Sequence, residues 1–104
     1  MAYKNPPTAI MYPDDYSYLG GRNQLEKMGL RIPEDISVVG YDGIGLSQAF
    51  RPRLTTYGQN TKVIGTEAAR KLIETIENGR ACVPEQIMVT GDLLEGESVA
   101  LPGR

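Results

Sequence analysis

Three carboxylates, Asp14, Asp15 and Asp42, stand where their spacing could support chemistry. The first two follow one short apolar run, and Asp42 follows another within the stretch Gly-Tyr-Asp-Gly-Ile-Gly. Ionised carboxylates accept hydrogen bonds from hydroxyl groups, ligate hard cations such as Mg²⁺, or form the acid–base pair of a glycosidase. The same residues also cap helices and close turns. A structural role is favoured for Asp15, whereas a structural role and a ligand-binding role both stay open for Asp14 and Asp42.

Catalytic alternatives find little support in the rest of the chain. The sequence contains no histidine, which excludes a Ser-His or Cys-His relay within it. Cys82 has no clustered partner and is typical of a small filler residue. The glycines of 40–45 have neither the GxGxxG spacing nor a Walker lysine. We therefore predict no enzyme activity, no cofactor and no metal site, because simple binding of a sugar explains the carboxylates with fewer assumptions.

Composition and charge are those of an ordinary soluble domain. The formal net charge is −2 and the 11 basic residues form no cluster, so this segment gives no support for contact with nucleic acid. No apolar stretch approaches the roughly 20 residues that span a bilayer, and the N-terminus has no signal-peptide core. The single cysteine excludes an internal disulfide framework. We expect a cytoplasmic protein with no membrane partner.

The elements that must position the carboxylates alternate between strand and helix. Strands are expected at 8–12, 36–41, 54–57 and 86–89, with 91–94 bending or ending the last one, and helices at 16–28 and 60–78. This order indicates an α/β fold with a mainly parallel sheet flanked by helices. Ligands bind beyond the carboxyl ends of such strands, which is the edge where the three carboxylates lie.

Each predicted helix has an apolar face. The expected faces are Leu19, Leu25 and Met28 in the first helix, and Ile64, Ala68, Leu72 and Ile76 in the second. Both patterns follow the helical period, with charged residues mostly on the other side.

A more specific signal is an ordered set of motifs. It comprises GLRIPEDISVVGYD (29–42), Pro52 with LTT (54–56), Gln59, and Gly65 with AA (68–69). Together these motifs resemble the bacterial lac repressor/gal repressor family, over a range from about Thr8 to Val99. The resemblance implies a Rossmann-like lobe of the type I periplasmic binding protein fold, in truncated form. Residues 1–104 would be the C-terminal portion of the effector domain, with lobe crossings near 57–60 and 87–92.

The resemblance also implies ligand-binding residues. Asp42 matches the effector-binding Asp of the family's Gly-Tyr/Phe-Asp motif, and Asp14 stands where members commonly have a ligand-contacting Asn. Because an ionised Asp only accepts hydrogen bonds, ligand preference would differ from that of members with Asn. Gln59 matches a polar position that faces the ligand cleft in several members. Its alternative reading is a solvent-facing residue at a helix start.

A dimer interface is implied for the segment after Asp42. The residues concerned are Leu46, Ala49 and Phe50, which resemble the stretch that packs across the family's dimer interface. Ordinary core packing is the alternative for Phe50, the only phenylalanine in the chain.

The resulting expectation is the effector-sensing portion of a LacI-type transcriptional regulator. It would bind a small polar, sugar-like effector, form a homodimer or higher oligomer, and reach DNA only through a helix-turn-helix module that this sequence lacks. Two alternatives stay open: a periplasmic sugar-binding transport receptor, and a self-associating fragment with no ligand activity. The apolar face of helix 60–78 would normally cover a sheet built by other residues, which favours self-association.

Overall fold

Two compact units make up the computed structural model, which describes residues 4–103. The first unit comprises Met1–Gly58 with Asp92–Arg104, and the second comprises Gln59–Gly91. The first unit contains a four-stranded sheet in the order β1-β2-β3-β4. Its strands are β1 (Ala9–Met11), β2 (Ser37–Asp42), β3 (Thr55–Gly58) and β4 (Asp92–Leu94). The first three strands are parallel and β4 is antiparallel to β3, which confirms the expected α/β fold with a mainly parallel sheet.

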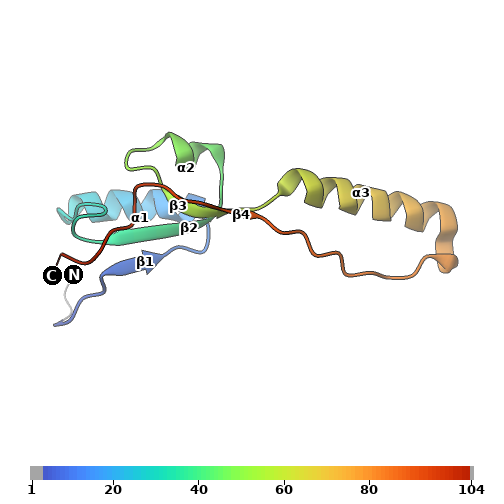
Figure 1. Ribbon diagram of the computed structural model, residues 1–104, viewed down its shortest axis with the longest axis horizontal. Coiled ribbons are helices and arrows are strands. Elements are labelled where there is room, and N and C mark those ends of the chain that lie inside the picture. Colours follow the sequence, from blue (N-terminus) through green and yellow to red (C-terminus); the bar gives the residue numbers. More distant parts are fainter. Residues whose placement is uncertain (1–3, 104) are drawn as a thin grey trace. The chain divides into compact units, whose positions relative to one another are not determined.

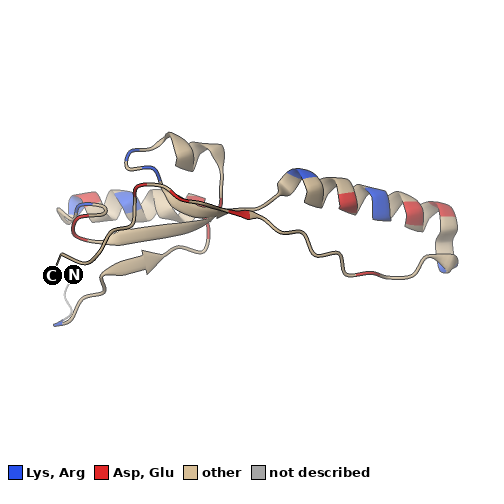
Figure 2. Ribbon diagram, in the orientation of Figure 1, with Lys and Arg blue, Asp and Glu red and all other residues tan. Residues whose placement is uncertain are grey.

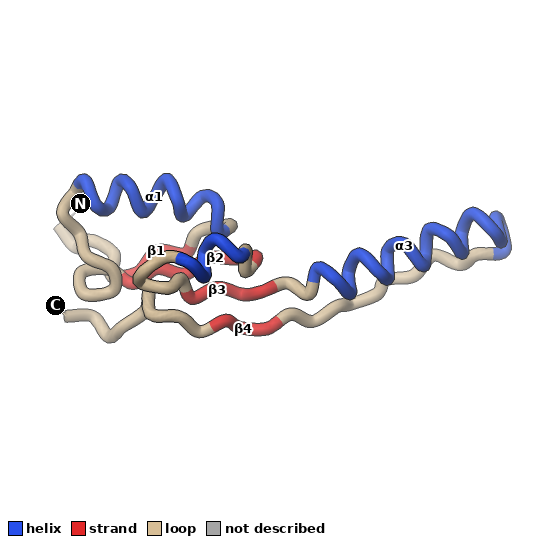
Figure 3. Tube along the Cα trace, turned by 90° about the horizontal axis from the view of Figure 1, so that it is seen from above, coloured by secondary structure: helices blue, strands red, loops and turns tan. Residues whose placement is uncertain are grey.

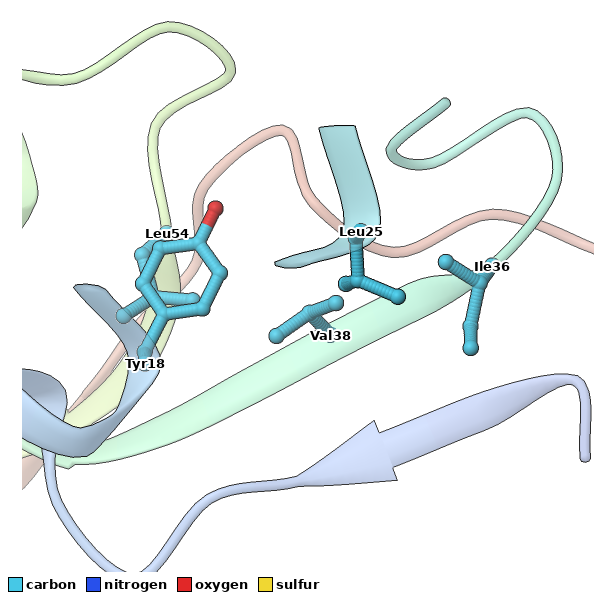
Figure 4. Close-up of a cluster of buried hydrophobic side chains, with 5 residues drawn as sticks. All are labelled: Tyr18, Leu25, Ile36, Val38 and Leu54. Atoms are coloured by element: carbon cyan, nitrogen blue, oxygen red, sulfur yellow. The ribbon is translucent and has the colours of Figure 1, made fainter. Parts of the chain in front are cut away.

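Helices α1 (Asp15–Lys27) and α2 (Gly45–Ala49) connect the parallel strands of the first unit (Figures 1 and 3). The Arg22 guanidinium of α1 lies 5.0 Å from the centre of the Phe50 ring, directly after α2, so the two helices are neighbours. Under the sheet-facing side of α1 lies a core of Tyr18, Leu25, Ile36, Val38 and Leu54 (Figure 4). Burial raises the pKa of the Tyr18 phenol above its ordinary value.

The opposite face of the sheet is largely uncovered among the described residues. Met11 and Leu93 are 80% and 68% exposed there. The Tyr41 and Tyr57 rings stack with their centres 5.6 Å apart. These side chains line a groove of about 500 Å³ whose lining contains no charged residue.

The chain after β4 is fastened to the sheet through Ser98. Its backbone accepts the N–H of Val38 at 2.9 Å, and its hydroxyl donates to the Val38 carbonyl at 2.6 Å. The same hydroxyl accepts the N–H of Thr55 at 2.9 Å. Ser98 is fully buried because it joins β2 to β3 where these strands begin.

The second unit consists of α3 (Thr61–Asn78), the short 3-10 helix η1 (Gly79–Ala81) and an extended segment up to Gly91. The Asn60 side chain caps α3 by accepting the N–H of Val63 at 3.3 Å. Acidic and basic residues are interspersed along α3 (Figure 2). None of the helix residues is buried. Across the described residues, no helix is both long and apolar enough to cross a membrane.

Most predicted elements are confirmed, and three expectations need correction. The strand expected at 86–89 is wrong: this segment is extended but unpaired, because its own unit offers no second strand, and the strand forms at Asp92–Leu94 instead. Met28 does not face the core; it is 42% exposed, and Tyr18 takes that place. Residues 45–49 form the helix α2, which was not among the expected helices.

Candidate functional site

The carboxyl edge of the parallel strands brings the predicted carboxylates into one region of the first unit. Met11, the last residue of β1, pairs with Val39 of β2; Asp14 follows Met11 by three residues in the chain, and Asp42 follows Val39 by three and ends β2. The start of α1 is joined to the turn after β2 by a hydrogen bond in which the Gly43 N–H donates to the Asp15 carboxylate at 3.0 Å. Topology thus gathers the acidic residues at a single rim, as the strand order predicts.

Asp14 is the N-cap of α1. Its backbone is extended, and its Oδ1 accepts the N–H of Ser17 at 2.6 Å. This cap satisfies one of the amide groups that a helix start leaves without an internal partner. The side chain is half-buried. A carboxylate offers about four acceptor sites, so capping and ligand contact are compatible.

Asp15 is fully buried at the first position of α1. Its Oδ2 accepts the N–H groups of Gly43 and Ile44, both at 3.0 Å, and its Oδ1 accepts the Thr56 hydroxyl at 2.8 Å. One carboxylate thus links α1, the turn after β2 and strand β3. The structural role that the sequence favours for Asp15 is correct in kind, but it is Asp14 that caps the helix.

Asp42 ends β2 in an unusual backbone conformation. Its φ is 117°, in the region that favours glycine, and the following Gly43 has φ 74°. A non-glycine residue held there costs about 1–3 kcal/mol, and such strain concentrates at functional sites. Asp42 is half-buried and lies opposite Gly58 in the β2–β3 ladder. Within residues 4–103 there is no group of three or more His, Cys, Asp or Glu side chains that could hold a metal ion.

The predicted interface residues lie on and after α2. Leu46 is 48% exposed and Ala49 is also exposed, whereas Phe50 is half-buried beneath the Arg22 guanidinium. Two of the three side chains are thus accessible to a partner. Gln59 belongs to the second unit, where its carbonyl accepts the N–H of Thr61 at 2.9 Å, and its assignment to the ligand site stays a prediction.

The second unit contains an ion-pair cluster that the sequence did not reveal. Lys71 Nζ donates to Glu85 Oε1 at 2.8 Å and to the Val83 carbonyl at 2.7 Å. The hydrogen bond from Lys71 lowers the pKa of Glu85, and the same bond raises the pKa of Lys71. These contacts fasten the extended segment to α3, and a groove of about 470 Å³ lies between them, lined in part by Ile64 and Ile87.

Two buried polar residues that contact the sheet escaped prediction. Thr56 stands in the LTT motif but was given no role, and Ser98 carries no motif, because each matters through a partner far along the chain. Gly40 did offer a signal: a glycine inside a buried strand marks a close approach by another group. In the structure that group is the Asp15 carboxylate, which occupies the space that a Gly40 side chain would need.

The chain is similar in sequence to part of several bacterial transcriptional repressors. A family model for the periplasmic binding protein-like domain matches residues 1–99. The probable HTH-type transcriptional repressor ExuR of Bacillus subtilis is 36% identical over 99 residues, covering 95% of this chain and 29% of the relative. The HTH-type transcriptional repressor CytR of Escherichia coli K12 is 35% identical over 97 residues, covering 93% of this chain and 28% of the relative. The chain therefore spans less than a third of either relative's length.

Solved structures of the same class share the fold. The putative transcriptional regulator LacI from Bacillus cereus subsp. cytotoxis superposes with a TM-score of 0.87 at 34% identity, covering 94% of this chain and 34% of that one. The lac repressor dimer bound to operator and the anti-inducer ONPF superposes with a TM-score of 0.80 at 30% identity, covering 91% of this chain and 32% of that one. A LacI family regulator from Enterococcus faecium with bound ribose superposes with a TM-score of 0.84 at 28% identity, covering 92% of this chain and 35% of that one. The chain therefore belongs to the periplasmic binding protein-like domain family, in the form found in LacI-type transcriptional regulators.

Proposed function

We propose that this chain forms one wall of the effector site of a LacI-type transcriptional regulator. In this proposal Asp42 and Asp14 accept hydrogen bonds from hydroxyl groups of a sugar-like ligand. The observation that carries the proposal is that both carboxylates follow neighbouring parallel strands at their carboxyl edge. The residues next to them in the chain, Asp15 and Gly43, are joined by a hydrogen bond. The strained backbone of Asp42 adds support, since strain of this kind concentrates at binding sites.

The chemistry of the rim favours a neutral, hydroxyl-rich ligand. Ionised carboxylates only accept hydrogen bonds, so the ligand must donate them. The two backbone N–H groups that could attract an anion, those of Gly43 and Ile44, already donate to Asp15. The related regulator from Enterococcus faecium holds ribose, a ligand of this chemical class. Hydrogen bonds to a charged acceptor contribute about 1.5–3 kcal/mol each when the site is desolvated.

A dimeric regulator is the context that we propose for the site. The exposed side chains of Leu46 and Ala49 would contribute to contact with a second protomer. The lac repressor, which shares the fold, is a dimer in its operator complex. Effector binding would then shift the balance between two arrangements of the regulator, provided that the ligand has different affinities for them. The repressor names of both relatives favour this function over that of a transport receptor.

Ribose titration of the isotope-labelled chain, followed by NMR, tests the proposal. Because the chain provides only one wall of a cleft, we expect weak binding, in the millimolar range, with the largest shift changes at Asp42 and Asp14. Asp42→Ala should abolish these changes, whereas Asp35→Ala, which alters a carboxylate in a different loop, should preserve them. In an intact regulator carrying this segment, Asp42→Ala should weaken induction in a reporter assay. Unchanged induction would remove Asp42 from the site.

A further inference from the structure

The turn that follows Asp42 has the form of an anion-binding nest. The N–H groups of two successive residues, Gly43 and Ile44, point to a single oxygen atom, Asp15 Oδ2. Successive amide groups in a turn with positive φ create a concavity that attracts negative charge. In this protein the anion is not a ligand: it is the side chain of Asp15, which is fully buried.

Several features of the surrounding structure accommodate this internal anion. Its second oxygen, Oδ1, accepts a hydrogen bond from the Thr56 hydroxyl of β3 at 2.8 Å. This hydroxyl and the N–H groups of Gly43 and Ile44 are all uncharged donors. Gly40 of β2 leaves the carboxylate its space, because a Cβ at that position would overlap Asp15 Oδ1 and lie 2.8 Å from Leu54 Cδ2. The site is thus formed by α1, β2, β3 and the turn together.

We propose that Asp15 is a positioning residue: as a built-in anion it fills the nest after Asp42 and thereby fixes the backbone that presents the Asp42 carboxylate. Asp42 has a φ of 117°, and a residue persists in such a conformation only where its surroundings over-determine it. The N–H groups of Gly43 and Ile44, which follow Asp42, both donate to the Asp15 carboxylate, and these hydrogen bonds constrain the Asp42 backbone. The role assigned to Asp42 in ligand binding rests on the proposed function above, whereas the role of Asp15 in the turn does not.

Chemical rescue distinguishes a built-in anion from a side chain that only fills space. In Asp15→Ala the carboxylate is removed, and the nest is open to a small anion from solution. We expect the Cα and Cβ chemical shifts of Asp42 to change, and amide exchange at Gly43 and Ile44 to accelerate roughly tenfold or more. Formate should reverse both changes saturably, whereas chloride at the same ionic strength should not. Asp35→Ala, which removes a carboxylate that accepts the Arg31 N–H, is the matched control and should leave Asp42 unchanged.

Two further variants keep the test decisive if Asp15→Ala does not fold. Gly40→Ala displaces the carboxylate without altering it, and should reproduce the changes at Asp42. Thr56→Val removes only the bond to Oδ1, and should lower stability while leaving the Asp42 shifts in place. Asp42 shifts that stay unchanged in a folded Asp15→Ala or Gly40→Ala protein would overturn the proposal. In a folded Asp15→Ala protein, failure of formate to restore the shifts would also overturn it.

Ribose addition to the wild-type chain separates this proposal from the function on which it draws. If ribose leaves Asp42 unaffected while the formate rescue succeeds, the ligand-binding proposal fails and the positioning role of Asp15 stands. If ribose perturbs Asp42 equally in the wild type and in Asp15→Ala, the positioning role fails and the ligand-binding proposal stands.

Discussion

Gly43 lies so close to Gly58 that the Gly58 backbone leaves no room for a side chain on Gly43. A Cβ built on Gly43 would lie 2.6 Å from the Cα of Gly58. Gly43 also has a φ of 74°, a value that residues with side chains rarely adopt. The contact holds the turn after Asp42 against the last residue of β3, at the boundary of the first unit.

Gly43→Ala should therefore destabilise the first unit, because it combines an unfavourable φ with a backbone clash. We expect a loss of about 2 kcal/mol or more in the free energy of unfolding. Gly45→Ala is the matched control two residues away: its Cβ would meet nothing within 4 Å, and it is the first residue of α2, so we expect little change in stability. Urea unfolding of both variants measures the difference, and equal midpoints would contradict the importance of the contact.

Replacing Asp42 with two different residues should separate folding from binding. Asp42→Gly removes the carboxylate and relieves the positive φ, so we expect it to raise the free energy of unfolding by about 1 kcal/mol. Asp42→Ala keeps the strain and should bring no such gain. Both variants should lose the response to ribose. If Asp42→Gly were destabilising, the backbone would not be strained at this position; a retained ribose response would instead argue against the carboxylate as acceptor.

The sequence predicts the framework of the fold better than it predicts the contacts of the rim. The apolar β-branched run of β2 and the amphipathic pattern of α3 are local signals, and both elements form where they are expected. The 86–89 segment shows the limit of such signals, because a β-prone run becomes a strand only when another strand is available to pair with it. The partners of Asp15 illustrate the same limit, since Ile44 and Thr56 lie 29 and 41 residues away along the chain.

Acidification should loosen the second unit through Glu85. Lys71 lowers the pKa of Glu85. The stabilisation from this carboxylate is therefore fully present at pH values above its ordinary pKa of 4.5, and it is lost as the pH falls through the lowered pKa. The pKa of Lys71 is raised, so the stabilisation from its ammonium group is fully present below pH 10.5 and is lost only in more alkaline solution. The pair therefore holds the extended segment to α3 between about pH 5 and pH 10.

NMR relaxation of the backbone amides of residues 83–89 provides the measurement. We expect greater mobility of this segment at pH 3 than at pH 7, and the same mobility at both values in Glu85→Gln, which cannot ionise. High salt should act like acid on the wild type, since exposed ion pairs are screened. A segment that stays equally ordered in Glu85→Gln at pH 7 would show that the ion pair does not hold it.

Self-association is expected from the apolar side of α3. Leu72, Ile73 and Ile76 are 61%, 54% and 73% exposed, and no residue of the helix is buried. Burying a side chain of this size stabilises a protein by about 1.5–3 kcal/mol, so exposed apolar surface of this extent favours association. We predict a dimer or higher oligomer in sedimentation equilibrium at low micromolar concentration. Leu72→Glu combined with Ile76→Glu should shift the distribution to the monomer, whereas Glu67→Gln, which alters a charge on the other side of the helix, should not. A folded wild-type chain that is purely monomeric under these conditions would show that the exposed stripe needs no partner chain.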